Sequence, residues 1–408
     1  MGFRKHRQSY RSFQYLDPAA DYKEFRLARE GNEFEACPVP LTPPQEARVT
    51  QLAQSCVMIS LHDHPVIFPA RIEETFAYAR EGRIFTAFEG LAQSYWDAVF
   101  DNLMDGIAVI TSKRGWKWTD VIHDLGMRLC DIAHQDLVIR CESTEDILQA
   151  HRDGKIALIP SLEGAAMIEN ELDRIEILFG LGVRQMGIAY SEANGLGSGL
   201  KEPRDGGLTH FGRQAVERMN KVGMAIDCSH AGDQTTLDVI QASAKPVFLT
   251  HVGARSLWNT RRMKPDDALQ ACADKGGVIG IEAAPHTTIT AAHPHHGIES
   301  FMEHFEYVRD LVGWDHVAFG PDTLYGDHAG LHLAFAQELS IRQSHEAQAG
   351  AREETPGFEK VRFVRGLENP TEASHNILRW LVRDDCSDEN IAKVMGGNIL
   401  RALKQMWP

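Results

Sequence analysis

The sequence lacks the features that mark secreted, membrane-spanning or nucleic-acid-binding proteins. Its seven cysteines are scattered and never form a CxxC pair, which excludes a clear disulfide framework and favours free thiols in a reducing compartment. Acidic residues outnumber basic ones, 57 against 42, so the chain has no general excess of basic charge for nucleic acid or an anionic membrane surface. No apolar run reaches the length of a transmembrane helix, and the basic amino terminus is not followed by the apolar stretch of a signal peptide. We therefore expect a cytoplasmic protein.

The 408 residues, 43% of them hydrophobic, are enough for one large domain or two smaller ones. Residues 1–50 are polar and end in the proline-rich PVPLTPP. We interpret them as an N-terminal arm outside a single domain that spans residues 51–408. The sequence does not fix the oligomeric state, and such an arm makes a homodimer reasonable.

From about residue 55, short apolar runs alternate with helical patterns. The runs lie at 56–64, 106–112, 156–164, 183–191, 223–230, 246–253, 276–284 and 316–322. Each resembles a strand that is buried on both faces, and the helical stretches 211–223 and 266–277 end at glycine. Eight such units predict an α/β fold of the (β/α)8 TIM-barrel type. A doubly wound sheet is the alternative.

Polar residues fall at the carboxyl ends of these predicted strands, and this placement favours the barrel. They are His62, His64, Glu163, Tyr190, His230, His251 and Asp322. In a barrel the carboxyl ends of all strands converge on one face, which carries the active site. We expect these side chains to meet there.

Four of these residues are histidines whose positions suit metal binding. His62 and His64 are two residues apart, so they point to the same side of a strand. His230 and His251 end consecutive predicted strands, which lie close enough to share one ion. Neutral imidazole is a good ligand for zinc and similar ions. Taken one at a time, solvated loop histidines and satisfied core histidines are the competing interpretations.

Two carboxylates complete the predicted site. Glu163 ends the apolar run IALIPSL, where burial of its charge is costly unless it is paired or coordinates a cation, and a carboxylate can bridge two metals. Asp322 ends HVAFGPD and is placed to exchange a proton with an activated water. A helix-capping role for Glu163 and a turn role for Asp322 are the alternatives.

An arginine pair follows the His251 strand in WNTRRMKPDD. Arg261 is our candidate for holding a substrate carboxylate with two parallel hydrogen bonds. Arg262 competes for that role, and a solvated surface arginine is the ordinary alternative.

In this order the residues resemble the renal, or membrane, dipeptidase family (peptidase family M19) of the amidohydrolase superfamily. The matching segments are LHDHP (61–65), SLEG (161–164), GLTHFGRQAVERMNKVGMAIDCSH (207–230), KPVFLTHVGARSL (245–257), HVAFGPD (316–322) and SDENIAKVMGGNILRAL (387–403). The resemblance covers about residues 55–405, and its longest block, 207–257, is the most specific.

The resemblance implies a barrel that holds two zinc ions and hydrolyses dipeptides. His62 and His64 would bind one metal, His230 and His251 the other, and Glu163 would bridge them. Asp322 falls where the family has its proton-shuttling aspartate, and Arg261 where it has the arginine that binds the dipeptide carboxylate. Nitrogen and oxygen ligands of this kind also accept Mn, Co or Fe.

The sequence departs from the family at two site positions. The family usually has His-x-Asp where this chain has His62-Asp63-His64, and it usually has a carbonyl-polarising histidine where this chain has Tyr190. A tyrosine hydroxyl can also donate a hydrogen bond to an oxyanion, so we assign Tyr190 to catalysis and substrate binding. The arginine segment is also loose, since the family usually has His-Pro-Arg-Asn where this chain has Asn-Thr-Arg-Arg.

The expected activity is therefore that of a zinc-dependent dipeptidase-like hydrolase whose small substrate carries a carboxylate. The alternatives are the same machinery acting on a non-peptide amide, lactam, ester or lactone, and a barrel that binds metal without catalysis. We expect the histidine-rich stretch 285–297 to form a loop over the site rather than a third metal site, and 340–365 to be an insertion or second lid.

Overall fold

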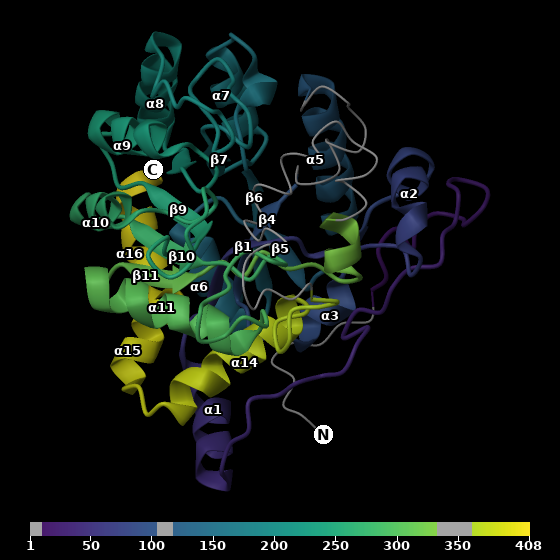
Figure 1. The fold of residues 1–408 in the computed structure, drawn as a ribbon. Coiled ribbons are helices and arrows are strands. Elements are labelled where there is room, and N and C mark those ends of the chain that lie inside the picture. The colour runs from purple at the N-terminus through teal and green to yellow at the C-terminus, as the bar shows by residue number, and fades with distance from the viewer. Residues whose placement is uncertain (1–9, 104–116, 333–360) are drawn as a thin grey trace.

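A computed structural model describes residues 10–103, 117–332 and 361–408 of the chain (Figure 1). Eight strands form the parallel barrel sheet: β1 (Ile59–Asp63), β4 (Ala98–Asn102), β6 (Ile156–Leu162), β7 (Gln185–Gly187), β8 (Ala225–Asp227), β9 (Phe248–Val252), β10 (Val278–Ile281) and β11 (Val317–Phe319). They pair in this order, and the short strand β5 (Val138–Arg140) pairs with β6 as an extra member.

The barrel is nearly closed where its first and last strands meet. The Asp322 N–H donates to the His62 carbonyl at 3.0 Å, and the His64 N–H donates to the Thr323 carbonyl at 2.9 Å. These bonds join the ends of β1 and β11. Because a doubly wound sheet would leave both edge strands apart, the observed order and closure confirm the predicted (β/α)8 fold.

Helices surround the strands on the outside (Figure 1). They are α1 (Pro43–Ser55), α2 (Thr75–Glu81), α3 (Phe88–Gln93), α5 (Trp118–Ile132), α6 (Thr144–Asp153), α7 (Asp173–Gly180), α8 (His210–Val222), α9 (Asp233–Ala242), α10 (Asp266–Asp274), α11 (Ile298–Val312), α14 (Pro370–Arg383), α15 (Asp388–Ala392) and α16 (Asn398–Met406). A two-stranded antiparallel sheet, β2 (Val66–Ile67) with β3 (Phe85–Thr86), lies beside the barrel strands.

Local sequence explains the ends of helix α8. The Thr209 side chain accepts a hydrogen bond from the Gly212 N–H, which caps the amino end, and Gly223 adopts a left-handed φ of 90° at the carboxyl end. The chain therefore turns sharply after α8 and enters β8. This entry sets the direction of the strand that leads to His230.

Seven of the eight predicted strands coincide with barrel strands. The second barrel strand is Ala98–Asn102, a segment that the sequence pattern did not indicate. The predicted strand 106–112 lies outside the described residues.

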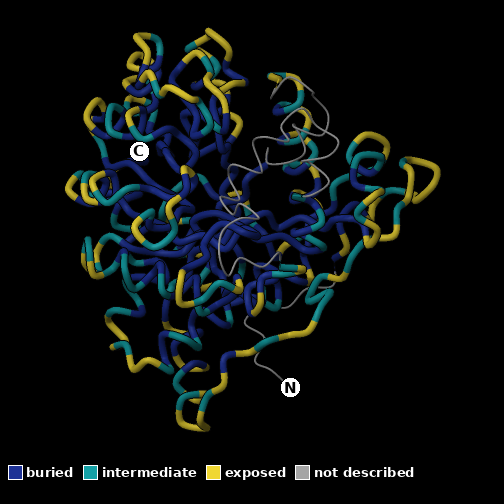
Figure 2. The backbone as a smooth tube through the Cα atoms, in the orientation of Figure 1, coloured by how far each residue is buried: buried dark blue, intermediate teal, exposed yellow. Residues whose placement is uncertain are grey.

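Apolar side chains fill the barrel interior and close the end at which the strands begin. Figure 2 shows that the residues of the strands are buried and that the exposed residues lie mainly on the outer helices and loops. Phe100 and Phe248 lie inside the barrel in one cluster with Trp407, which follows α16. The Trp407 indole N–H donates to the carbonyl of Arg184, the residue just before β7, at 3.2 Å. The amino ends of the strands are thus sealed, and the polar site lies at the opposite ends.

The amino-terminal segment packs against the outside of the barrel. The Val39 N–H donates to the Asn376 side chain in α14 at 2.9 Å, and the Tyr10 hydroxyl donates to Asp131 in α5 at 2.6 Å. Among the described residues, the helices are all too short or too polar to cross a bilayer.

Candidate metal centre

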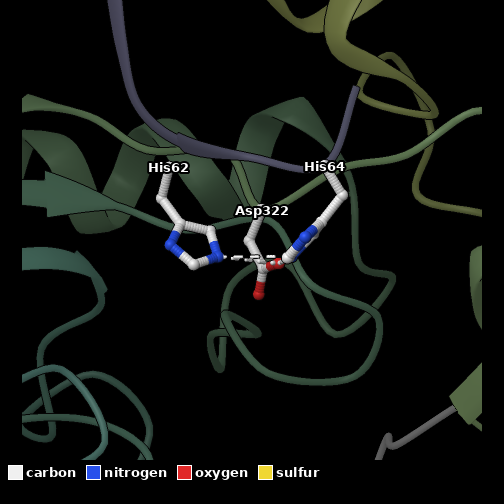
Figure 3. Close-up of side chains that lie close together, drawn as sticks. All are labelled: His62, His64 and Asp322. Carbon is white, nitrogen blue, oxygen red and sulfur yellow. Dashed lines mark hydrogen bonds and ion pairs between the residues drawn. The ribbon is translucent and has the colours of Figure 1, made fainter. Parts of the chain in front are cut away.

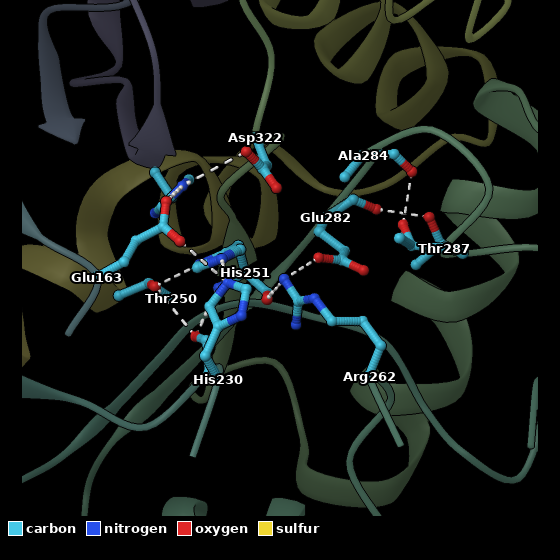
Figure 4. Close-up of polar contacts among 12 residues, drawn as sticks. Glu163, His230, Thr250, His251, Arg262, Glu282, Ala284, Thr287 and Asp322 are labelled. Atoms are coloured by element: carbon cyan, nitrogen blue, oxygen red, sulfur yellow. Dashed lines mark hydrogen bonds and ion pairs between the residues drawn. The ribbon is translucent and has the colours of Figure 1, made fainter. Parts of the chain in front are cut away.

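The predicted histidines and carboxylates come together at the carboxyl ends of the barrel strands (Figure 4). His62 lies in β1 with His64 directly after it, and His251 lies in β9. Glu163, His230 and Asp322 follow β6, β8 and β11, and the side chains of all these residues are buried.

His62, His64 and Asp322 form one side of the site (Figure 3). The Nε2 atoms of the two histidines are 3.3 Å apart. Asp322 Oδ1 lies 3.0 Å from His64 Nε2 and 3.5 Å from His62 Nε2. Three atoms with metal-ligand chemistry therefore point at one small volume.

His230 and His251 form the other side. Their Nε2 atoms are 2.8 Å apart, and the ring of His251 stacks on that of His62 with centroids 3.6 Å apart. The two histidine pairs are therefore in direct contact.

Glu163 lies between the two pairs. Its Oε1 is 3.2 Å from His62 Nε2, and its Oε2 is 3.1 Å from His230 Nε2. Each carboxylate oxygen thus faces a different histidine pair, which is the arrangement that a bridging carboxylate requires.

Hydrogen bonds behind the rings fix which nitrogen faces the centre. His64 Nδ1 lies 3.1 Å from the Asn102 carbonyl oxygen. Because a carbonyl can only accept, His64 carries its proton on Nδ1 when it is neutral, and Nε2 keeps a lone pair. His251 Nδ1 lies 2.7 Å from the Thr250 hydroxyl, which supports the same orientation. Such outer contacts are typical of metal-binding histidines.

The electrostatics of the site suit cation binding. Burial, followed by the charge of Arg262, lowers the pKa of His230 well below its ordinary value, and burial followed by His62 does the same for His251. Burial alone would lower the pKa of His62, but hydrogen bonds with Asp322 and Glu163 raise it well above its usual value. Buried carboxylates at this spacing call for a positive charge among them.

The donor set fits divalent metal ions. Three overlapping groups of buried side chains bring their ligand atoms within 4.8 Å of one another: His62, His64 and Asp322; His62, Glu163 and His251; and His251, Glu282 and Asp322. Imidazole nitrogens mixed with carboxylate oxygens suit zinc and also Mn, Co or Fe. The residues present are therefore able to hold a metal centre.

The structure separates the two adjacent arginines. Arg261 is exposed, and its Nη1 donates to the Glu202 carbonyl at 2.9 Å. Arg262 is buried, its Nη2 donates to the His251 carbonyl at 2.9 Å, and it forms an ion pair with Glu282. Arg262 therefore lies beside the site, whereas Arg261 is exposed and contacts the segment that contains Glu202.

Glu282 is a site residue that the sequence analysis missed. It directly follows β10 and is fully buried, with a carboxylate oxygen close to His251 and Asp322 (Figure 4). The pattern that could have identified Glu282 is the one that identified Glu163, namely an acidic residue at the end of an apolar strand.

A model of the membrane dipeptidase family (peptidase family M19) matches residues 53–333. The match covers most of the barrel and all the site residues described above. The chain belongs to this family.

Individual relatives agree with this assignment. Dipeptidase tcpJ of Claviceps purpurea is 27% identical over 286 residues, which are 69% of this chain and 58% of that protein. The matched region thus spans less than two thirds of that relative. An amidohydrolase from Pseudomonas aeruginosa is 26% identical with a TM-score of 0.68, and the alignment covers 88% of this chain and 99% of that one.

A metallopeptidase from Rhodobacter sphaeroides, liganded with a phosphinate mimic of the dipeptide L-Ala-D-Ala, has a TM-score of 0.64 at 18% identity. That alignment covers 86% of this chain and 99% of that one. At this identity the likeness shows the fold alone. The family match and this likeness therefore agree on a member of the membrane dipeptidase family with a TIM-like barrel.

The two departures from the family pattern both lie at the site. His64 takes the place of the usual aspartate and contacts Asp322. Tyr190 follows β7, is half-buried and stacks on the His230 ring with centroids 4.2 Å apart. A tyrosine therefore borders the histidine pair on one side.

The histidine-rich stretch 285–297 is a packed loop between β10 and α11. His286 and His296 are buried, and His296 Nδ1 accepts from the His286 N–H at 3.1 Å while its Nε2 lies 2.8 Å from the Thr288 hydroxyl. Within the part of the chain that the structure describes, the potential metal groups include none of its histidines. Most of the predicted lid 340–365 falls outside the described residues.

Proposed function

We propose that this protein is a dinuclear-metal hydrolase that cleaves a dipeptide or a similar small amide, with zinc as its metal. The position of Glu163 between the two histidine pairs supports this most directly, because one carboxylate oxygen faces each pair. In this proposal His62 and His64 hold one ion, His230 and His251 hold the other, and Glu163 bridges them.

Two such ions would supply Lewis acidity to the amide carbonyl and to the attacking water. The protein's own residues do the rest. The Asp322 carboxylate accepts a proton from the water and returns it to the departing amine. The Tyr190 hydroxyl donates a hydrogen bond to the developing oxyanion. Burial of the surrounding side chains excludes bulk water and strengthens these interactions.

Of the two arginines, we assign the inner position to Arg262, because it is buried and contacts His251. The role first predicted for Arg261, holding a substrate carboxylate, stays a prediction.

Metal analysis with a matched variant tests this function. Purified protein reconstituted with zinc is expected to contain two equivalents and to hydrolyse dipeptides. Glu163→Gln should lose at least one equivalent and lower kcat/KM by about 100-fold or more, because a neutral amide bridges cations poorly. Glu217→Gln removes a carboxylate that pairs with Lys221 on the outer surface of α8 and serves as the control.

The same experiment separates the alternatives. Two metal equivalents with hydrolysis of a lactam or lactone but of no dipeptide would favour a non-peptide substrate. Two equivalents with no hydrolysis of any of these substrates would favour a non-catalytic metal-binding barrel. A zinc-treated protein that retains no metal would overturn the proposal.

A further inference from the structure

Asn102 ends strand β4 and lies directly behind both histidines of the first pair. β4 is the neighbour of β1 in the barrel, so the end of β4 meets the segment that carries His62 and His64. The Asn102 carbonyl oxygen is 3.1 Å from His64 Nδ1, and its side-chain Nδ2 is 3.4 Å from His62 Nδ1. The residue is 4% exposed. One buried residue therefore contacts the outer nitrogen of each ring.

The inner nitrogen of the His62 ring faces the candidate metal centre. His62 Nε2 is 3.2 Å from Glu163 Oε1 and 3.5 Å from Asp322 Oδ1, and Figure 3 shows that the other nitrogen of this ring points away from Asp322. A neutral imidazole carries one proton, so a ring that binds a metal through Nε2 must carry that proton on Nδ1. His62 Nδ1 then needs a hydrogen-bond acceptor.

The Asn102 amide supplies that acceptor after a half-turn. Its Nδ2 now faces His62 Nδ1, but an amide nitrogen can only donate, and the 3.4 Å separation is long for a hydrogen bond. Asn102 Oδ1 is buried, and no described residue donates a hydrogen bond to it. A half-turn exchanges the oxygen and the nitrogen of the amide within the same space. Oδ1 then accepts from His62 Nδ1, which satisfies a buried acceptor as well.

We propose that Asn102 is a positioning residue for the metal centre. Its main-chain carbonyl holds the Nδ1 proton of His64 and its side-chain oxygen holds that of His62, so that both rings present the lone pair of Nε2 to one ion. Outer contacts of this kind fix the tautomer and the orientation of metal-binding histidines. With a histidine rather than an aspartate at position 64, the site has two Nδ1 protons to satisfy, and Asn102 is adjacent to both. This inference rests on the proposed function, because it concerns the ion that His62 and His64 would hold.

Two variants of similar size test the acceptor role. Asn102→Leu removes the polar atoms of the side chain, and it should weaken the binding of one zinc equivalent by about 10- to 100-fold. Asn102→Asp keeps an oxygen acceptor and cannot donate, so it should bind that equivalent at least as tightly as wild type does. Competition with a chromophoric chelator measures both affinities. Unchanged zinc affinity in Asn102→Leu, or an Asn102→Asp variant as weak as Asn102→Leu, would overturn the inference.

Asn398→Leu is the matched control for the loss of a buried amide. Asn398 is 3% exposed, and its Nδ2 donates to the carbonyls of Trp314 and Val317 near the amino end of β11, away from the site. This variant should lower the melting temperature and leave the zinc affinity unchanged. If it weakened zinc binding as much as Asn102→Leu does, the effect of Asn102→Leu would be one of stability, and the inference would fall.

The tautomer of His62 is a second readout, which a purely structural role of Asn102 would not move. NMR spectra of nitrogen-labelled zinc protein report it, with the His62 signals identified by their loss in His62→Gln. We expect the proton on Nδ1 of His62 in wild type and in Asn102→Asp. A proton on Nε2 would overturn the inference. If Asn102→Leu fails to fold, these spectra and the zinc affinity of Asn102→Asp still decide.

Zinc binding and hydrolysis separate this inference from the proposed function. If the zinc protein hydrolyses no substrate, the proposed activity fails, while the affinities and the spectra still test Asn102. Normal hydrolysis together with unchanged zinc affinity in Asn102→Leu would overturn the inference alone. A wild-type protein that binds no zinc would overturn both.

Discussion

At the scale of single residues, Asp322 combines a charge with an unusual backbone conformation. Its φ is 59°, in the left-handed region that most L-residues avoid. Its N–H donates to the His62 carbonyl, and its side chain turns back to His62 and His64. The strained turn thus directs the carboxylate into the site, and such strain is typical of functional positions.

Asp322→Asn tests the proton-transfer role without disturbing that turn. Asparagine adopts the left-handed region as readily as aspartate does, so the fold should be kept while the proton acceptor is lost. We expect kcat to fall by about 100- to 10,000-fold with little change in melting temperature. Steady-state kinetics and thermal unfolding measure the two effects. An unchanged kcat in an active enzyme would remove Asp322 from the mechanism.

The structure brings together all seven strand-end residues that the sequence singled out, but the sequence could not resolve Arg261 from Arg262. Adjacent residues on an extended loop project in different directions, and the choice depends on how the chain leaves β9. Glu282 was missed because it was taken as part of the apolar run 276–284. Its partner Arg262 is remote in sequence, so only the fold reveals the pair.

At the scale of secondary-structure elements, the β6–β7 contact positions Glu163. A Cβ on Gly187, at the end of β7, would lie 1.9 Å from the Glu163 carbonyl oxygen. A glycine is therefore required for the two strand ends to approach each other.

Gly187→Ala should push the Glu163 backbone away from the site. We expect a loss of about 1–3 kcal/mol in unfolding free energy together with weaker zinc binding. Gly126→Ala is the matched control, since Gly126 is exposed in α5 and a Cβ there meets nothing within 4 Å. It should stabilise the helix by about 0.5–1 kcal/mol. Denaturant titration and zinc competition assays measure both variants, and equal effects would contradict the packing argument.

One barrel strand, Ala98–Asn102, could not be predicted from the sequence. Buried strands rich in apolar residues were found from sequence, because both faces of a barrel strand are covered. Ala98–Asn102 ends in Asp101 and Asn102, which are polar yet buried. Asp101 pairs with Arg128 in α5, and the Asn102 carbonyl faces His64. These partners come from distant parts of the chain, so the local pattern could not identify the strand.

At the scale of the whole molecule, a buried carboxylate is one of the groups that hold the amino-terminal arm to the barrel. Glu368, just before α14, accepts hydrogen bonds from the N–H groups of Glu33 at 2.5 Å and Phe34 at 3.2 Å, and from the Asn32 amide at 3.2 Å. These hydrogen bonds connect segments that are more than 330 positions apart in the sequence.

Burial raises the pKa of Glu368 from 4.5 to about 7, against the lowering effect of the Glu33 and Phe34 N–H groups. The folded protein therefore binds this proton more tightly than the unfolded chain does, and the contribution of Glu368 to stability falls as pH rises from about 4.5 to 7.

Glu368→Gln keeps one acceptor oxygen and removes the titration. At pH 8 the variant should be more stable than wild type by about 1–2 kcal/mol, allowing for solvent screening, and the difference should vanish near pH 4.5. Urea unfolding across this range measures the difference. Parallel curves for the two proteins would show that Glu368 does not titrate in the folded state, and a less stable variant at pH 8 would show that the arm needs the charge.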